Sequence, residues 1–287
     1  MNMLTTPDLA PDTSAQARRV GPPILQVEHL SREFGGVLAV GDLSFTIAAG
    51  DIHSIIGPNG AGKTTLVDAV TGLNRPSQGS IEFEGVSIMG LKEHQIVRRG
   101  IGRSFQTPTV FESLSVAQNL DLAESFRRPM VSMFRRHALM SVGVAETLER
   151  IGLMSMATAK AGALSHGQKQ WLEIGMLLVQ KPRLLLLDEL VAGMTPQERL
   201  DTGALLQELA GDHTVVVVEH DMSFLRRFAT SVTVLHQGTI LSEGSVEEVQ
   251  ADERVREVYL GRSRDERSGA ALAGESQASA DSDMAEA

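Results

Sequence analysis

The sequence predicts a mixed α/β fold that is interrupted by a helical subdomain. Two short and nearly all-apolar runs, Leu184–Leu187 and Val215–Val218, are typical of strands in a parallel sheet that is covered on both faces. Between these runs Thr195 and Glu198 form a capping box with proline at the first helical position, so strand, helix and strand make a βαβ unit. Residues from about 91 to 180 have a mainly helical pattern.

Three earlier stretches predict an antiparallel sheet at the start of the folded body. Ile24–Leu30 alternates apolar and polar residues, as a half-buried strand does, and Leu43–Ile47 and Ile81–Glu84 are similar and lie next to glycine turns. A further strand is predicted at Ile52–Ile56. It leads through a glycine-rich loop into a helical run, Lys63–Val70.

Composition limits the class of protein. The chain has 287 residues and no cysteine, which excludes a disulfide scaffold, a thiolate metal site and a cysteine nucleophile. Its formal charge of −10 argues against a nucleic-acid partner. No run approaches the ~18 apolar residues of a membrane span, and no signal peptide is recognisable, so we expect a soluble intracellular protein.

The two ends differ in composition from the middle of the chain. Residues 1–23 combine prolines with small polar residues, and residues 262–287 are mostly Ser, Ala, Asp, Glu and Gly. Neither segment contains enough apolar surface to offset its ordering entropy. We therefore expect a disordered segment at each end and a folded body at residues 24–261.

The first chemical motif is a glycine-rich loop, Gly57-Pro-Asn-Gly-Ala-Gly62-Lys63-Thr64, which fits G-x-x-x-x-G-K-[ST]. Glycines let successive N–H groups point at phosphate oxygens, the lysine reaches the β- and γ-phosphates, and the threonine hydroxyl faces Mg²⁺. A glycine turn that only caps a helix is the alternative, but the strand–loop–helix context favours ATP and Mg²⁺ binding. The predicted ATP-binding residues of this loop are Gly57, Pro58, Asn59, Gly60, Ala61, Gly62, Lys63, Thr64 and Thr65.

The second motif is the acidic pair Asp188-Glu189 at the end of the strand Leu184–Leu187. Ligands of open α/β sheets bind at the carboxyl edge, so Asp188 is predicted to hold Mg²⁺ through water. Glu189 is then placed to orient and deprotonate an attacking water. Without the phosphate loop the pair would be an ordinary strand end.

The third motif is Leu164-Ser165-His166-Gly167-Gln168. Ser165 and Gln168 form a capping box that opens a helix reaching Val179. A helix N-terminus with a serine hydroxyl and a glycine N–H is also an anion site. Both interpretations hold together, because such a cap can face the phosphate of another molecule.

The order of these motifs, with Gln106 and His220, resembles the ATP-binding subunit of an ABC transporter over about residues 24–261. The resemblance implies a P-loop NTPase core, with a mixed sheet and an antiparallel N-terminal β subdomain, plus the inserted helical subdomain at about 91–180. It implies that Phe34 stacks on adenine, that Gln106 senses Mg²⁺ and the attacking water, and that His220 contacts the γ-phosphate. The signature residues that would contact ATP on a partner subunit are Ser165, His166, Gly167 and Gln168.

The sequence departs from the family pattern after Glu189, where Leu190 replaces the usual proline. This departure is expected to loosen the turn that aims Glu189, which bears on the hydrolysis rate and not on ATP binding. His166 replaces the usual glycine of the signature, which backbone contacts should tolerate.

The resemblance also implies partners and a solute class. Membrane permease subunits, a second ABC ATPase chain and, indirectly, an extracytoplasmic solute-binding protein are expected, with the chain bound peripherally at the cytoplasmic face of the inner membrane. His166 and the run Lys169-Gln-Trp-Leu-Glu173 favour an importer of urea or short-chain amides, and a branched-chain amino-acid importer is the alternative. A soluble ABC ATPase, or a module that binds ATP without hydrolysing it, stays open as another class.

Overall fold

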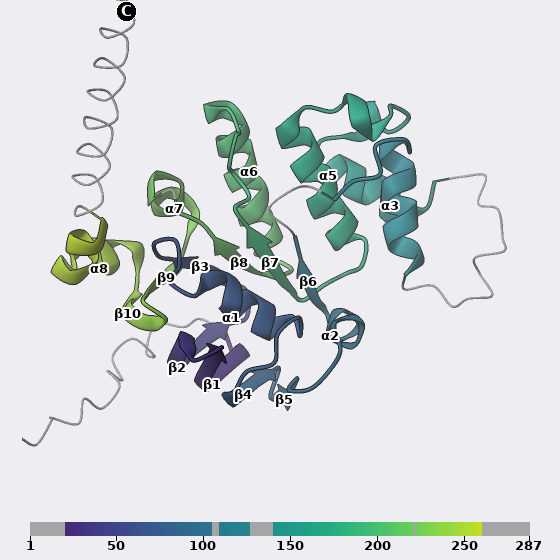
Figure 1. Cartoon of the computed structure of the whole chain (residues 1–287). Coiled ribbons are helices and arrows are strands. Elements are labelled where there is room, and N and C mark those ends of the chain that lie inside the picture. Colours follow the sequence, from purple (N-terminus) through teal and green to yellow (C-terminus); the bar gives the residue numbers. More distant parts are fainter. Residues whose placement is uncertain (1–20, 105–108, 127–139, 221, 260–287) are drawn as a thin grey trace, which may run out of the picture.

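The computed structural model describes residues 21–104, 109–126, 140–220 and 222–259 (Figure 1). The segments predicted to be disordered lie outside the described residues, apart from 21–23, where the first strand begins. The helices are α1 (Lys63–Val70), α2 (Glu93–Arg99), α3 (Val116–Ser125), α4 (Val142–Arg150), α5 (His166–Leu178), α6 (Pro196–Leu209), α7 (Met222–Phe228) and α8 (Val246–Ala251), with short 3-10 turns η3 (Met154–Met156) and η4 (Ala161–Ala163).

The strands form two sheets. The strands are β1 (Pro23–Phe34), β2 (Val37–Ala48), β3 (Ile52–Ile56), β4 (Gln78–Phe83), β5 (Val86–Ser87), β6 (Ile101–Arg103), β7 (Leu184–Asp188), β8 (Thr214–Val218), β9 (Ser231–His236) and β10 (Thr239–Gly244). A four-stranded antiparallel sheet has the order β2-β1-β4-β5, and a six-stranded sheet has the order β10-β9-β3-β8-β7-β6. Every neighbouring pair of the larger sheet is parallel except β9 and β10. The mixed α/β fold is therefore confirmed, including its antiparallel start.

The larger sheet is buried on both faces, and the period of two along its strands divides the core. Leu184 and Leu186 belong to a cluster that α1 shares with β1, β2 and β4, so α1 lies between the two sheets (Figure 1). Leu185 and Leu187 point to the opposite face and pack with residues of α3, α4, α5 and α6. Burial on both sides explains why β7 and β8 contain apolar residues without alternation.

One strand lies in the range for which the sequence predicts mainly helix. β6 has only three residues, Ile101–Arg103, and pairs in parallel with β7 at the edge of the larger sheet. The preceding helix, α2, contributes Ile96 to the cluster around α1. The start of the predicted helical subdomain, about residue 91, therefore includes elements that pack with the sheet core, and the helices α3, α4 and α5 follow them.

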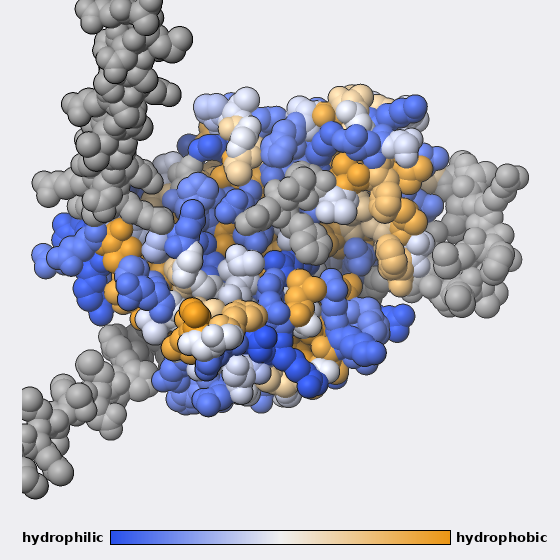
Figure 2. All heavy atoms as spheres, viewed as in Figure 1, coloured by the Kyte–Doolittle hydropathy of each residue, from blue (hydrophilic) through white to orange (hydrophobic). Residues whose placement is uncertain are grey.

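No helix of the described ranges is long and apolar enough to span a bilayer. The face seen in Figure 2 is largely polar, with apolar side chains gathered on the side where α3 lies in Figure 1. Phe126, directly after α3, and Met140 and Val142, around the start of α4, are exposed large apolar residues.

Candidate functional site

The carboxyl ends of adjacent parallel strands bring the predicted catalytic motifs to one edge of the larger sheet. β3 leads into the glycine-rich loop, β7 ends at Asp188, and β8 between them leads into Glu219 and His220. Backbone hydrogen bonds continue past the strands, because Glu219 N–H donates to Ile55 O at 3.3 Å and Glu189 N–H donates to Val218 O at 2.9 Å. The sheet thus sets the spacing of these groups.

The glycine-rich loop wraps the start of α1 with left-handed backbone. Gly60 and Gly62 have φ of 80° and 99°, a region in which a side chain is strained. At Gly62 a Cβ would also lie only 2.7 Å from Ala39 O, so the loop approaches β2 too closely for any other residue. Around Gly60 a Cβ would meet nothing within 4 Å. The loop is therefore packed against β2 at Gly62 and has open space around Gly60.

Lys63 is folded back over this loop. Its Nζ donates to Gly57 O at 2.7 Å and to Pro58 O at 3.1 Å. Thr64 on the first turn of α1 is exposed, and Thr65 beside it is half-buried. An ammonium group, a hydroxyl and the N–H groups of a helix start are thus brought together, which is the donor set that phosphate oxygens require.

Asp188 is buried at the end of β7, with 4% of its surface exposed. Its N–H donates to Ser104 Oγ at 3.2 Å, and its Oδ2 lies 3.9 Å from Arg103 Nη2. Burial raises the pKa of Asp188 above its ordinary value, the Glu189 charge adds to this, and the Arg103 and Lys63 cations oppose it. Arg103 also pairs with Asp68 of α1 at 2.6 Å, so its guanidinium connects α1 to the carboxylate of β7.

Glu189 occupies a strained position directly after this strand. Its φ is 50°, in the left-handed region that side chains rarely adopt, and the residue is half-buried. Besides donating to Val218 O, its backbone accepts a hydrogen bond from Ala192 N–H at 3.4 Å. A fixed backbone with a partly exposed carboxylate suits a group that acts on a water molecule.

Glu219 is a site residue that the sequence analysis missed. It is 1% exposed, accepts from Val191 N–H at 2.9 Å and from His220 N–H at 3.3 Å, and its Oε2 lies 3.9 Å from His220 Nδ1. Burial raises its pKa, which the hydrogen bonds and the His220 charge partly offset. The signal was available, because an acidic residue follows the apolar run of β8 just as Asp188 ends β7.

Two residues predicted from the resemblance have different outcomes. Phe34 ends β1 and is 42% exposed, and the Arg32 guanidinium lies 4.4 Å from its ring centroid. One face of the ring therefore carries a cation, and stacking on adenine stays a prediction. Gln106 lies outside the described residues, two positions beyond Ser104 at the end of β6.

The signature motif forms the predicted cap of α5. Ser165 Oγ accepts from Gln168 N–H at 3.2 Å, and Gln168 Oε1 accepts from Ser165 N–H at 3.0 Å. The Ser165 hydroxyl also donates to Glu198 Oε1 of α6 at 3.2 Å. His166 is exposed at the first position of the helix and Gly167 is buried behind it. The capping box is confirmed, and Glu198 is a contact that sequence reasoning did not find.

The donor set fits Mg²⁺ bound together with a nucleotide. The described residues contain no cluster of three or more His, Asp or Glu side chains that could enclose a metal by themselves. Mg²⁺ is characteristically held by one or two carboxylates, waters and substrate phosphates. Asp188 supplies a carboxylate and Thr64 a hydroxyl, and the glycine-rich loop adjoins both by topology.

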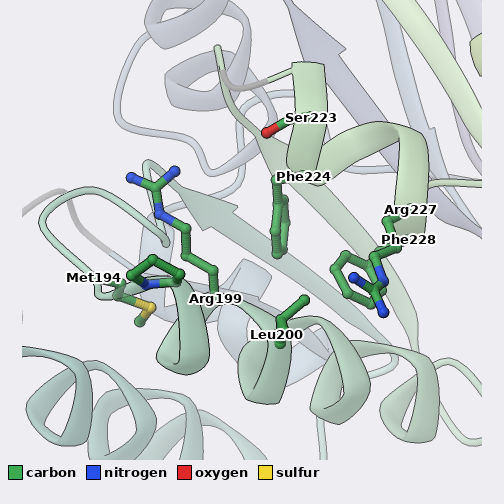
Figure 3. Close-up of a pocket in the computed structure, with 8 residues that line it drawn as sticks. Met194, Arg199, Leu200, Ser223, Phe224, Arg227 and Phe228 are labelled. Atoms are coloured by element: carbon green, nitrogen blue, oxygen red, sulfur yellow. The ribbon is translucent and has the colours of Figure 1, made fainter.

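A separate pocket of about 510 Å³ lies between the starts of α6 and α7 (Figure 3). Phe224 points toward α6 from above, and Leu200 of α6 lies below it. Its lining residues are Met194, Pro196, Arg199, Leu200, Ser223, Phe224, Arg227 and Phe228. None of the residues predicted to bind ATP belongs to this lining, so the pocket is distinct from the sheet edge.

Comparison with known proteins adds an independent line of argument. Residues 40–192 match a family profile described as ABC transporter, and residues 239–265 match one described as Branched-chain amino acid ATP-binding cassette transporter. The chain is 36% identical over 252 residues to the high-affinity branched-chain amino acid transport ATP-binding protein BraF of Pseudomonas aeruginosa, an alignment that covers 83% of this chain and 98% of BraF.

A second relative and a solved structure agree with this result. The LivG protein of Escherichia coli K12, with the same description, is 36% identical over 250 residues, with 83% of this chain and 98% of LivG covered. The crystal structure of the ADP conformation of MJ1267, an ATP-binding cassette of an ABC transporter, is similar with a TM-score of 0.75 and 30% identity. That match covers 84% of this chain and 99% of MJ1267.

Proposed function

Because the chain belongs to the family of ATP-binding subunits of ABC transporters, we propose that it powers a membrane importer of branched-chain amino acids by hydrolysing ATP. The family accounts for ATP binding and for the ATPase activity. The solute, the partners and the roles of single residues are the proposed part.

One observation carries the catalytic assignment: the phosphate-binding loop, the Asp188-Glu189 pair and the Glu219-His220 pair end three adjacent strands at the same edge of the sheet. A nucleotide whose phosphates lie on the loop therefore has acidic and imidazole groups beside its terminal phosphate.

In the proposed reaction Lys63 exchanges the carbonyls of Gly57 and Pro58 for the β- and γ-phosphate oxygens of ATP. Glu189 orients a water molecule and takes its proton, and His220 contacts the γ-phosphate. Glu219 positions both groups, because its two carboxylate oxygens bind the backbone on either side of the site. Phe34 stacks on adenine, and Gln106 reports on the γ-phosphate to the helical subdomain.

Asp188 and Thr64, with Gln106, would hold Mg²⁺ on the nucleotide. When bound, this ion neutralises charge on the phosphates and keeps them in line for attack. The chain's own contribution is a buried carboxylate: Arg103 of β6 lies beside its Oδ2, and Ser104 Oγ, directly after β6, accepts from the backbone N–H of Asp188.

Two chains are proposed to complete each site. Ser165 and Gly167 at the start of α5 offer a hydroxyl and a backbone N–H to the ATP of a second, similar chain. The side chain of Ser165 accepts from Gln168 N–H and donates to the Glu198 carboxylate of α6. In the two-chain site a partner's phosphate takes the place of the Glu198 carboxylate as the anion at this helix start.

For the solute, the relatives support the second candidate of the sequence analysis better than the first. BraF and LivG are described as transport proteins for branched-chain amino acids, and a profile with the same description matches residues 239–265. The expectation of urea or short amides rested on His166 and the Lys169–Glu173 run, and no comparison supports it. Since an ATPase subunit does not touch the solute, transport has to be measured.

The importer assignment implies membrane permease subunits as partners. We further propose a peripheral position at the cytoplasmic face of the membrane and an extracytoplasmic binding protein that delivers the solute. The exposed apolar residues near α3 and α4 support a contact surface on the helical side of the molecule (Figure 2).

The test is to purify the chain with its co-expressed membrane subunits and reconstitute the complex in proteoliposomes. ATP turnover and uptake of labelled leucine and labelled urea are measured side by side. Lys63→Ala should abolish nucleotide binding, and Glu189→Gln should keep binding while turnover falls by about 10²-fold or more.

Leucine uptake that depends on Glu189 would support the proposal. Urea uptake without leucine uptake would overturn the solute, and ATP turnover by a chain that never binds membrane subunits would favour a soluble ATPase. ATP binding without turnover, in the complex as well as alone, would favour a regulatory module.

A further inference from the structure

The signature serine already has an anionic partner inside its own chain. The Ser165 hydroxyl donates to Glu198 Oε1 at 3.2 Å, across 33 positions of sequence and from α5 to α6. The same carboxylate lies against the next glycine of the motif: a Cβ on Gly167 would sit 2.6 Å from Glu198 Oε1. The start of α5 is thus covered by a carboxylate.

Capping of α6 uses only one of the two oxygens of the Glu198 carboxylate. Glu198 Oε2 accepts from Thr195 N–H and from Thr195 Oγ1, both at 2.9 Å, which completes the capping box of α6. Oε1 is left for Ser165. The hydrogen bonds from Thr195, with those from Ser165 and the charge of His166, lower the pKa of Glu198, so it is anionic near neutral pH.

A second anion at the same place must compete with this carboxylate. The start of α5 has partial positive charge and unpaired N–H groups, which favour one anion. The Ser165 hydroxyl has a single proton, so it cannot donate to Glu198 and to a phosphate oxygen at once. A nearby carboxylate also repels the phosphate.

We propose that Glu198 is an internal competitor for Ser165 that raises the ATP concentration at which two chains close on each other. This inference rests on the proposed two-chain site. In the separate chain Glu198 holds the serine hydroxyl. When a partner's ATP arrives, its phosphate displaces Glu198 from Ser165, while the Thr195 contacts keep α6 capped.

The test measures ATP-dependent association of the full chain in the Glu189→Gln background, which slows hydrolysis. Light scattering gives the mass as a function of chain concentration with and without Mg-ATP. The chain is measured alone and mixed with the ATPase chain that co-purifies with the membrane subunits. The competing charge is removed by Glu198→Gln, which retains the capping box because glutamine serves equally at that position.

Asp201→Asn is the matched control. Asp201 is exposed on the same helix, three positions further on, and its side chain bonds to Gln197 and not to α5. It removes one negative charge from α6 without touching Ser165. Thermal melting of both variants shows whether either change affects folding.

Glu198→Gln should tighten ATP-dependent association by about threefold to tenfold at low salt, with the gain shrinking as salt is added, and Asp201→Asn should not. If the Glu189→Gln parent associates with ATP but Glu198→Gln gains no more than the control, the competition is refuted and the two-chain site stands. If the parent does not associate with ATP in either mixture, the two-chain site is refuted and the competition with it.

Discussion

Arg103 on β6 is expected to be the main counter-ion of two poorly exposed carboxylates, Asp68 and Asp188. Its Nη1 lies 2.6 Å from Asp68 Oδ1 and 3.2 Å from Thr71 Oγ1, and its Nη2 lies 3.9 Å from Asp188 Oδ2. The side chain is 11% exposed, and the two carboxylates are 20% and 5% exposed. Arg103→Met therefore leaves two poorly solvated carboxylates without their guanidinium.

The magnitude follows from this burial. Removing one partner of a fully buried ion pair costs about 3–5 kcal/mol. Because Asp68 retains some solvent and a hydrogen bond from Asn74 Nδ2 at 2.9 Å, we expect a loss near the lower limit, about 3 kcal/mol of unfolding free energy. Arg103→Lys keeps the positive charge but lacks the planar guanidinium that reaches three oxygens, so its loss of unfolding free energy should be about half that of Arg103→Met.

Urea unfolding followed by circular dichroism measures this loss. With an unchanged slope of about 2–3 kcal/mol per molar urea, the midpoint of Arg103→Met should fall by about 1 M. Arg256→Met is the control, since the Arg256–Glu253 pair is 3.8 Å apart with side chains 54% and 88% exposed. Its change should stay within about 0.5 kcal/mol.

Activity provides a second measurement of the same charge. Burial raises the pKa of Asp188, and Arg103 is the first of the cations that lower it. Without Arg103 the pKa rises further, so the acidic limb of the pH–turnover profile should move to higher pH. An Arg103→Met chain that unfolds with wild-type free energy and keeps its acidic limb would refute the assignment of Arg103 as counter-ion.

Three further predictions use single side chains. Gly203→Ala should lower the free energy of unfolding by about 1–2 kcal/mol, because the added Cβ would lie 2.2 Å from the Phe228 ring. At an open helix position the same change would stabilise the protein by about 1 kcal/mol. Urea unfolding measures the loss, and adding Phe228→Leu should restore stability. Burial raises the folded-state pKa of Glu219 above 4.5, so above that pH the native state binds more protons than the unfolded state and the free energy of unfolding falls as pH rises. Urea unfolding of Glu219→Gln at several pH values should show a smaller fall. An unchanged dependence of the unfolding free energy on pH would contradict this prediction. Gly57→Ala should weaken ATP binding in calorimetry more than Gly60→Ala, because a Cβ at Gly57 would lie 2.3 Å from a carbonyl oxygen of β9 whereas Gly60 has open space; equal losses would contradict the packing argument.

Local chemistry made much of the site predictable. The glycine-rich loop, the helix start at Lys63, and the capping boxes of α5 and α6 depend on residues within a few positions of each other. β7 and β8 were predictable because strands buried on both faces have to be apolar throughout. The structure confirms each of these elements.

The remaining parts depend on tertiary contacts that a single sequence does not display. β6 has three residues, one of them glycine, which is too short for an alternation pattern. The Arg103–Asp68 pair spans 35 positions and the Ser165–Glu198 contact spans 33, so neither has a local signature. The solute was not predicted by the motifs: the sequence favoured urea or short-chain amides, whereas the relatives BraF and LivG are described as branched-chain amino acid transport proteins.

The missing proline after Glu189 shows how tertiary structure replaces a local constraint. Proline would restrict that turn through its ring, and from sequence its loss should loosen the aim of Glu189. In the structure Leu190 is buried, and the two flanking N–H groups are held, Glu189 by Val218 O and Val191 by Glu219 Oε1.

Glu219 therefore takes over the control of this turn. Its carboxylate holds Val191 N–H with one oxygen and His220 N–H with the other, so the loop of the proposed base and the residue proposed to contact the γ-phosphate share one buried group. A ring at position 190 would fix the turn independently of the neighbouring strand. A shared carboxylate instead ties the turn after Glu189 to the segment that carries His220, because one buried side chain binds the backbone of both.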